Sequence, residues 1–286
     1  MIIFHDPRCV QYDRFGHVER PERISATAPL LRERHPNWEW REPAPADEIA
    51  LRRVHSAEHL ASIRDARADF DADCPVYPQL FEHAARAAGA AIDGARASLR
   101  GEQSFSLMRP PGHHATRSRV MGFCYFSNIA IAAFDALENG ANRIAIFDFD
   151  AHHGNGTEEM VTNHPRITFA SVHQFPGWPG TGTVSAGNIR NFPVAPMIGR
   201  ATHMFAIEQA LEWLLFSKPD LLLVSAGFDA YAGDPITQMR LEAEDFATCG
   251  RWLGESGVPA AAILEGGYSE QLPELIDAFL REWSSE

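Results

Sequence analysis

The chain has 286 residues, of which 45% are hydrophobic and 22% are charged, as in an ordinary globular protein. This composition excludes a disordered chain, a collagen and a small disulfide scaffold, because a chain of this length can bury a large core without covalent links. The formal net charge is −13. A negative surface repels the nucleic-acid backbone, so we expect no direct nucleic-acid partner.

Apolar segments along the chain predict six strands, at residues 2–4, 105–108, 143–149, 167–172, 221–224 and 260–264. Segments of helical periodicity lie between them and predict helices at residues 80–99, 129–137, 204–216 and 246–253, with a last helix from about Pro273 to Trp283. The Pro- and Ala-rich residues 41–50 are predicted to form a loop. Strands that are apolar throughout and alternate with helices favour a parallel sheet covered on both faces. With no linker or repeat in the sequence, we predict one α/β domain over residues 1–286.

We expect neither a membrane-spanning segment nor an export signal in this sequence. No apolar run approaches the roughly 20 residues of a membrane helix, and the first residues lack the pattern of a signal peptide. Cysteines are few and widely spaced, at Cys9, Cys74, Cys124 and Cys249. This pattern predicts reduced thiols in a cytoplasmic protein without a membrane partner. Nothing in the sequence indicates an oligomeric state.

Polar residues follow five of the predicted strands. The segments are RPPGHHA, DFDAHHGNGT, SVHQ, SAGFDA and EGGY, in chain order. Ligands of open parallel sheets bind outside the carboxyl ends of the strands. We therefore expect these segments to converge on one site.

A metal site is predicted within these segments. Asp150 and His152 are two residues apart at a strand exit, where they can face the same side. Asp229, after another strand, can supply a third ligand. Two carboxylates and one imidazole leave a fourth position for water, as a hydrolytic zinc site requires. Asp148, on the same strand as Asp150, is suited to orient a histidine.

Two adjacent histidine pairs strengthen this interpretation. An isolated D-x-H is common and seldom binds a metal, and Asp229 alone could be a turn or helix-cap residue. His113-His114 and His152-His153, however, both lie at predicted strand exits. We expect His153 to be a buried, hydrogen-bonded residue rather than a ligand. Other histidines, such as His35, His164 and His203, are expected on the surface.

The motifs RPPGHHA, GFCYFSN, DFDAHHGNGT, SAGFDA and LEGGY resemble, in order and spacing, those of the histone deacetylase family. HVERPERI and VHSAEHL are also similar, and the resemblance runs from about Phe4 to Tyr268. It implies the arginase–deacetylase fold, a single three-layer domain with a mostly parallel sheet of about eight strands flanked by helices.

The resemblance also implies roles for individual residues. One zinc ion is implied at Asp150, His152 and Asp229, and catalytic roles fall on His113, His114, Tyr268, Asp148 and Asn155. Asp148 would support His113, and Asn155 would be the partner of His114. Substrate-binding positions are Phe123, Trp178, Gly122 and Gly267, with Trp178 where the family often has Phe, and Arg23 matches an internal-channel arginine. A potassium ion is implied at Asp148, Asp150, His152, Ser171 and Val172.

The implied reaction is hydrolysis of an acyl amide. Zinc would activate water, His114 would act as general base and then acid, and Tyr268 would donate to the oxyanion. The substrate would be an acylated lysine side chain or an acetylated small amine. Polyamine-selective relatives carry a glutamate where this chain has Ile236, which favours the acyl-lysine alternative.

Two other readings of the sequence are open. A two-manganese ureohydrolase of the arginase type needs additional acids, but Gly154 and Tyr231 occupy those positions. A non-catalytic acyl-lysine-binding module would have lost the metal ligands or Tyr268, and all of these are present. Both readings are therefore less favoured than a single-metal deacetylase.

Overall fold

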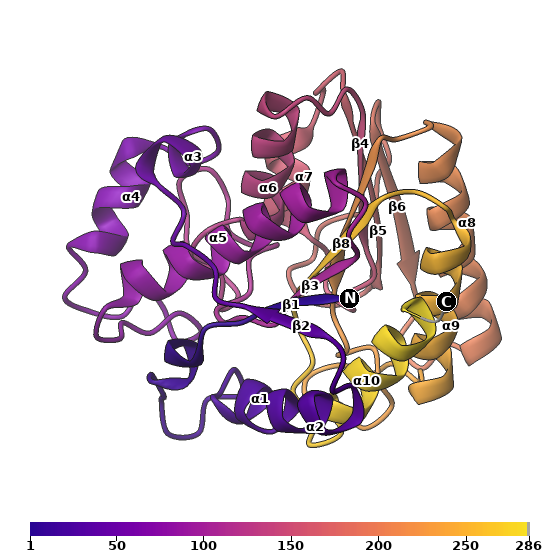
Figure 1. Cartoon of the computed structure of the whole chain (residues 1–286), viewed down its shortest axis with the longest axis horizontal. Helices are drawn as coiled ribbons and strands as arrows, with labels where there is room; N and C mark the ends of the chain where they lie inside the picture. The colour runs from indigo at the N-terminus through magenta and orange to yellow at the C-terminus, as the bar shows by residue number, and fades with distance from the viewer. Residues whose placement is uncertain (285–286) are drawn as a thin grey trace.

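The strands of the protein lie at β1 (Ile2–Phe4), β2 (Glu39–Arg41), β3 (Ser104–Ser106), β4 (Ile144–Asp148), β5 (Ile167–Gln174), β6 (Ile189–Val194), β7 (Leu221–Ala226) and β8 (Ala260–Leu264). They form one eight-stranded sheet in the order β2-β1-β3-β8-β7-β4-β5-β6 within residues 1–284, the part of the chain that this computed structural model describes (Figure 1). Neighbouring strands are parallel throughout.

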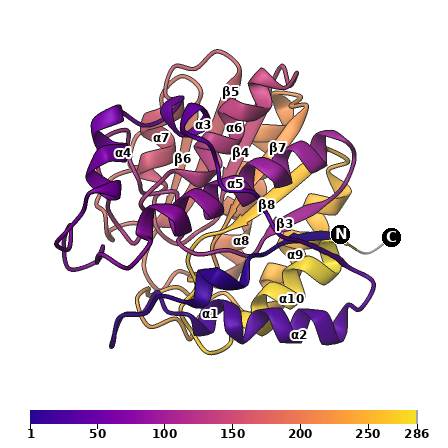
Figure 2. The same ribbon diagram turned by 60° about the vertical axis from the view of Figure 1, so that its left-hand side comes forward.

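Helices cover the two faces of this sheet (Figures 1 and 2). Their bounds are η1 (Pro7–Val10), α1 (Glu22–Ser25), α2 (Thr27–Arg34), α3 (Glu48–Arg52), α4 (Ala57–Arg64), α5 (Leu80–Leu99), α6 (Asn128–Glu138), α7 (Asn155–Val161), α8 (Arg200–Phe216), α9 (Ala243–Glu255) and α10 (Leu272–Trp283). Helices α5, α6 and α7 pack on one face, and α8, α9 and α10 pack on the other. The predicted fold class, a parallel sheet of about eight strands flanked by helices, is confirmed.

The central strands show why both faces are buried. In β4, Ile144 and Ile146 belong to the core beneath α5–α7, whereas Ala145 and Phe147 belong to the core beneath α8–α10. Successive side chains of a strand point to opposite faces, so a strand covered on both faces must be apolar at every position. This explains why β4, β7 and β8 read as continuous apolar runs.

The two strands absent from the sequence prediction are both edge strands. β2 has three half-exposed or exposed residues, Glu39, Trp40 and Arg41. β6 contains Arg190 and Pro193, which an edge strand tolerates because one side of it has no strand partner. Neither segment shows the apolar run that identified the central strands. The predicted loop at residues 41–50 was thus wrong at its ends, where β2 finishes and α3 begins.

The surface assignment of His203 was also wrong. This side chain is 1% exposed on α8, and burial lowers its pKa to about 4. It lies on the helix face that packs on the sheet, although α8 has weak apolar periodicity. His35 and His164 are half-buried.

The sheet order determines where the site can form. β3, β8, β7 and β4 occupy four consecutive positions, and all run in the same direction. The residues that follow these strands therefore meet at one edge of the sheet. Within residues 1–284, none of the helices combines the length and the apolar character needed to cross a membrane.

Candidate active site

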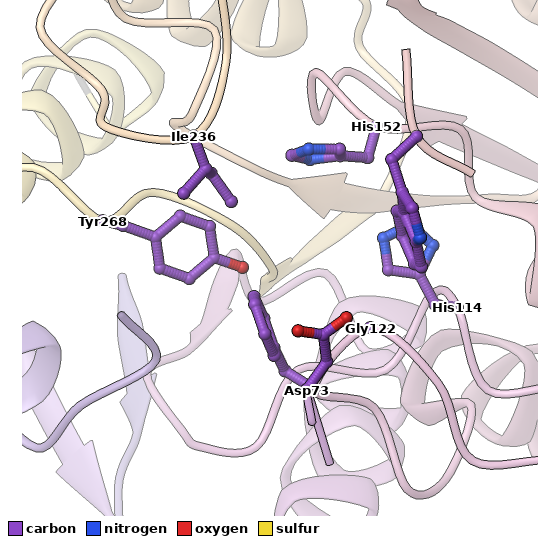
Figure 3. Close-up of a pocket in the computed structure, with 8 residues that line it drawn as sticks. Asp73, His114, Gly122, His152, Ile236 and Tyr268 are labelled. Atoms are coloured by element: carbon purple, nitrogen blue, oxygen red, sulfur yellow. The ribbon is translucent and has the colours of Figure 1, made fainter. Parts of the chain in front are cut away.

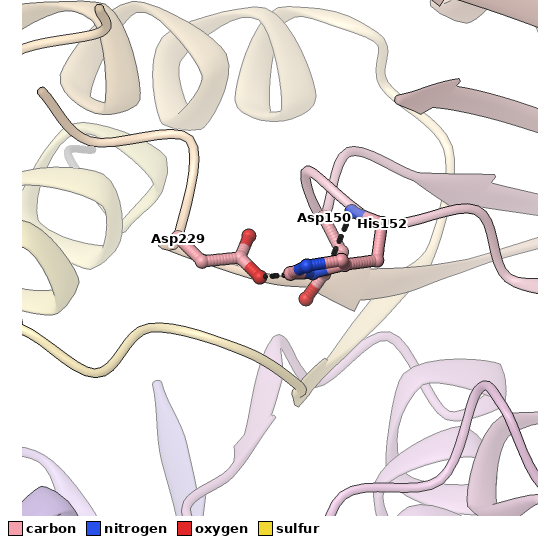
Figure 4. Close-up of side chains that lie close together, drawn as sticks. All are labelled: Asp150, His152 and Asp229. Carbon is pink, nitrogen blue, oxygen red and sulfur yellow. Dashed lines mark hydrogen bonds and ion pairs between the residues drawn. The ribbon is translucent and has the colours of Figure 1, made fainter. Parts of the chain in front are cut away.

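Three side chains suited to holding a metal ion meet at the exits of β4 and β7 (Figure 4). Nδ1 of His152 lies 2.7 Å from Oδ2 of Asp229 and 3.2 Å from Oδ1 of Asp150. One ligand atom from each residue lies within 4.8 Å of the others. Both carboxylates are fully buried. Two buried carboxylates beside one imidazole form a donor set that suits a divalent cation such as zinc.

Backbone N–H groups orient the two carboxylates. Gly266 donates to Oδ2 of Asp150 at 2.7 Å, and Ala151 donates to Oδ1 of Asp229 at 2.8 Å. A Cβ atom at Gly266 would lie within 2.5 Å of both carboxylates, so this close approach requires glycine. The structure thus brings the predicted ligands together, and these backbone N–H groups hold the two carboxylates in place.

The histidine pair lies beside the triad. Nδ1 of His113 donates to Oδ2 of Asp148 at 3.0 Å, and Nδ1 of His114 donates to Oδ1 of Asn155 at 2.8 Å. Because an amide oxygen can only accept, the proton of neutral His114 resides on Nδ1. Its Nε2 therefore carries the lone pair that could accept a proton.

Burial and neighbouring charges separate the two histidines electrostatically. Burial lowers the pKa of His114 well below its ordinary value, and the nearby His113 and His152 act in the same direction. Burial alone would also lower the pKa of His113, but the carboxylates of Asp150 and Asp148 raise it to about 10. His114 is thus the neutral member of the pair at neutral pH, and His113 the charged one.

This difference predicts a pH profile. If neutral His114 accepts the proton, the acid limb that it contributes to kcat should lie below pH 6.5, the ordinary pKa of histidine. The measurement is kcat against pH on metal-loaded protein, with metal content determined at each pH so that metal loss is not mistaken for protonation. An acid limb above pH 6.5 with metal retained would contradict this role of His114.

A pocket of about 220 Å³ opens over these groups (Figure 3). It is lined by Asp73, His114, Gly122, Phe123, His152, Trp178, Ile236 and Tyr268. The Tyr268 hydroxyl points into the pocket, across from His114 and His152. Burial raises the pKa of Tyr268 well above its ordinary value, so this hydroxyl keeps its proton as a donor.

Aromatic rings form the walls of the pocket. Phe123 meets Tyr268 edge to face at 5.6 Å between ring centroids, and Trp178 meets His114 edge to face at 4.6 Å. Trp178 is 44% exposed, so it forms the outer part of its wall. The structure thus brings both predicted tunnel aromatics to the pocket.

A tight turn presents Phe123. Gly122 and Phe123 have φ of 55° and 66°, and Met121 and Cys124 exchange backbone hydrogen bonds on either side. This is the geometry of a two-residue turn with two positive φ values, which is costly for phenylalanine. A Cβ atom at Gly122 would lie 2.5 Å from the Trp178 ring, so glycine lets the walls approach each other.

The segment that carries Tyr268 is anchored from three sides. Nε of Arg23 donates to the Gly267 carbonyl at 2.7 Å, and the Arg23 guanidinium lies 4.9 Å from the Tyr268 ring centroid. The Tyr268 N–H donates to Oδ2 of Asp234 at 2.8 Å. Gly267 has φ of 113°, a conformation that favours glycine. The tyrosine is therefore fixed by its backbone and by its ring.

Other predicted positions also lie near the triad. Asp148 pairs with Ser171 in the register of β4 and β5, and Val172 follows directly. Potassium binding at these residues, together with Asp150 and His152, stays a prediction. His153 is 2% exposed and hydrogen-bonds Thr181 and Glu158, as expected for a residue that is not a ligand.

Two residues at the site were not singled out from the sequence. Asp73 lines the pocket but comes from an irregular, polar loop that gave no signal. Glu265 directly follows the apolar strand β8 and is fully buried. A charged residue at the end of a fully apolar strand was a signal that could have identified it.

Comparisons with known proteins find similarity to deacetylases and related amidohydrolases. A family model described as "Histone deacetylase domain" matches residues 17–282. A "Probable deacetylase" of Methanothermobacter thermautotrophicus is 35% identical, over 100% of this chain and 91% of that protein. "Acetylpolyamine amidohydrolase 2" of Pseudomonas aeruginosa is 36% identical over 70% of this chain and 61% of that one. The crystal structure of the HDA15 HD domain superposes with a TM-score of 0.94 at 28% identity, covering 100% of this chain and 91% of that one.

Proposed function

Because this chain belongs to the histone deacetylase family, we propose that it is a zinc-dependent amidohydrolase that removes acetyl or other short acyl groups from acyl-lysine-type amides. The observation that carries this proposal is the triad of His152 and the two buried carboxylates of Asp150 and Asp229, which faces the Tyr268 hydroxyl across a pocket. When bound, zinc would supply a Lewis acid that polarises the amide carbonyl and lowers the pKa of a water molecule. The family is generally zinc-dependent, which supports this choice of metal.

The proton transfers are assigned to His114. Its Nε2 accepts a proton from the attacking water and later gives it to the leaving amine, while Asn155 holds the ring through Nδ1. Positioned proton transfer of this kind typically contributes about 10²–10⁴-fold in rate. His113, tied to Asp148, orients the pair and supplies positive charge.

The remaining pocket residues bind the substrate and stabilise the developing charge. Tyr268 donates its hydroxyl proton to the oxyanion in a hydrogen bond, which its buried, protonated state allows. Phe123 and Trp178 hold the alkyl chain of the acyl amine between them, at a separation that Gly122 permits. Gly267 gives the tyrosine segment its turn.

The direct test is hydrolysis of an acetyl-lysine peptide with and without a chelator. We expect chelated protein to be inactive and to recover on addition of zinc. Hydrolysis that a chelator leaves unchanged, or no hydrolysis of any acyl amide by metal-loaded protein, would contradict the proposal. The second result would favour a non-catalytic binding module.

The arginase-type alternative is disfavoured by the packing at Gly154. A Cβ atom at this position would lie 2.1 Å from Oδ2 of Asp148, so an additional acidic ligand could not fit there. Tyr231 occupies the other position where a second metal would need an acid. Titration to two metal ions per chain would reverse this conclusion.

An acetylated small amine is the second candidate substrate. The relative in Pseudomonas aeruginosa is named as an acetylpolyamine amidohydrolase, and Asp73 offers a carboxylate in the pocket lining. No hydrogen bond or ion pair to this carboxylate is found among residues 1–284. It could therefore attract a distant ammonium group, whereas the apolar Ile236 on another wall could not.

We expect Ile236→Glu to move specificity toward acetylated polyamines. The ratio of kcat/KM for an acetylated polyamine to that for an acetyl-lysine peptide should rise roughly fivefold, the size of a surface ion pair. Ile49→Glu is the matched control. This substitution adds the same charge, but Ile49 is exposed on α3 and does not line the pocket. An unchanged ratio in Ile236→Glu would show that this wall does not select the amine.

We also propose that the protein works in the cytoplasm. The cysteines Cys9, Cys74, Cys124 and Cys249 are all free and buried, which supports a reducing compartment. Burial raises the pKa of the Cys124 thiol well above its usual value, so this neighbour of Phe123 has no nucleophilic role.

A further inference from the structure

The carboxylate of Glu265 lies fully buried behind the histidine pair. Its Oε2 accepts hydrogen bonds from the backbone N–H groups of Gly112 at 2.7 Å and His113 at 3.1 Å. Its Oε1 accepts from the Ser225 hydroxyl at 3.1 Å. Among residues 1–284, no cation forms an ion pair with this carboxylate. A buried carboxylate is costly unless it is hydrogen-bonded, so its placement here demands a specific set of donors.

The same histidine segment is held on its other side by α7. The His113 carbonyl accepts from the N–H groups of Gly156 and Thr157, at 3.0 and 3.1 Å. A Cβ atom at Gly112 would lie 2.5 Å from the Asn128 nitrogen, so the segment has no room to shift in that direction. The peptide that precedes His114 is thus clamped between Glu265 and the first turn of α7.

Glu265 also begins the segment that carries the tyrosine. The next residue, Gly266, donates to Oδ2 of Asp150, and the Glu265 carbonyl accepts from the Arg23 guanidinium. Tyr268 follows three residues after Glu265. The side chain of Glu265 therefore contacts the segment of the histidine pair. Its backbone leads directly to the N–H group that binds Asp150 and to Tyr268.

We propose that Glu265 is a positioning residue that fixes His113 and His114 against the metal triad and Tyr268. This inference rests on the proposed function, since the geometry matters for a reaction that uses all three groups. Glu265 lines no part of the pocket, and its side chain reaches the catalytic histidines through the Gly112 and His113 backbone. A misplacement of catalytic groups by about 1 Å can cost about 10²-fold in rate.

Two substitutions at Glu265 separate the effect of side-chain length from the effect of charge. Glu265→Gln keeps the length, so its amide oxygen can accept from Gly112 and His113 and its NH₂ can donate to the Ser225 hydroxyl. Glu265→Asp keeps the charge but withdraws the acceptor by one methylene. We expect the Gln variant to retain kcat near that of the parent. The Asp variant should lose roughly 10–10²-fold in kcat, with KM and zinc content unchanged.

Hydrogen exchange gives a readout that does not require turnover. The Gly112 and His113 amides should exchange slowly in the parent and in Glu265→Gln, and faster in Glu265→Asp. Equal protection of these amides from exchange in all three proteins would refute positioning by these hydrogen bonds. So would a loss of kcat in Glu265→Gln as large as that in Glu265→Asp. A parent protein that hydrolyses no acyl amide would refute the proposed function instead, while the exchange comparison would still decide whether Glu265 holds the histidine segment.

Discussion

Asp229→Ala is expected to fold, to lose its metal ion and to lose hydrolytic activity. The substitution leaves Asp150 and His152 as the two remaining ligands. Loss of a group that merely supports a ligand typically costs about 10–100-fold in metal affinity, so loss of the ligand itself should cost more. The fold should survive, because Asp150 and Asp229 are fully buried like charges: burial and then repulsion from Asp150 raise the pKa of Asp229 to about 7.

The measurements are elemental analysis of the purified variant, circular dichroism and turnover of an acetyl-lysine peptide. Asp220→Ala is the matched control, because Asp220 lies at the amino end of β7 and Asp229 follows the carboxyl end. The control should keep its metal and its activity. Full zinc occupancy in Asp229→Ala would remove Asp229 from the ligand set.

Tyr268→Phe is expected to keep the fold and the metal but to lose most activity. The hydroxyl points into the pocket, while the ring is packed against Phe123 and Arg23, so phenylalanine preserves the packing and removes only the donor. Loss of one oxyanion donor typically costs about 10²–10³-fold in kcat. KM should change little, since the donor acts on charge that develops during the reaction.

Tyr77→Phe is a suitable control for this experiment. Tyr77 is buried outside the pocket, and its hydroxyl has no hydrogen-bond partner among residues 1–284. Its removal should leave kcat unchanged. Equal turnover by Tyr268→Phe and the parent would exclude the tyrosine from the mechanism.

The sequence predicted the fold well where both faces of a strand are buried. β4, β7 and β8 are buried at every position because helices cover them on each side, and their apolar runs, broken only by Ser225 and the terminal Asp148, stand out from their surroundings. The edge strands β2 and β6 meet solvent and tolerate charge and proline, so no periodic pattern marks them. Their place in the sheet depends on pairing with distant segments.

The sequence predicted the metal ligands and catalytic residues of the site, but not the hydrogen bonds that hold them in position. Asp150, His152 and Asp229 follow strands whose order could be guessed only through the family resemblance, and the structure brings their ligand atoms together. The role of Glu265 depends on which backbone N–H groups its carboxylate meets across the sheet edge. Such contacts between β8 and a segment about 150 positions earlier leave no local trace in the sequence.

The need for glycine where the backbone closely approaches other groups was likewise not predictable from the sequence. Glycine at Gly266 is required because two carboxylates lie where its Cβ atom would be. In the sequence, Gly266 and Gly267 could serve equally well as an ordinary turn. Only the structure shows that Gly266 is needed for space, whereas Gly267 is needed for its positive φ and also for space, since its Cβ atom would lie 2.7 Å from the Leu272 side chain.

The central claim is that one metal ion is bound by Asp150, His152 and Asp229. A crystal structure of zinc-soaked protein, with anomalous difference maps recorded at the zinc edge, tests this most directly. We predict a single strong peak in contact with all three side chains and facing the Tyr268 hydroxyl. A map with no peak among these side chains, or with two peaks at the site, would contradict the account.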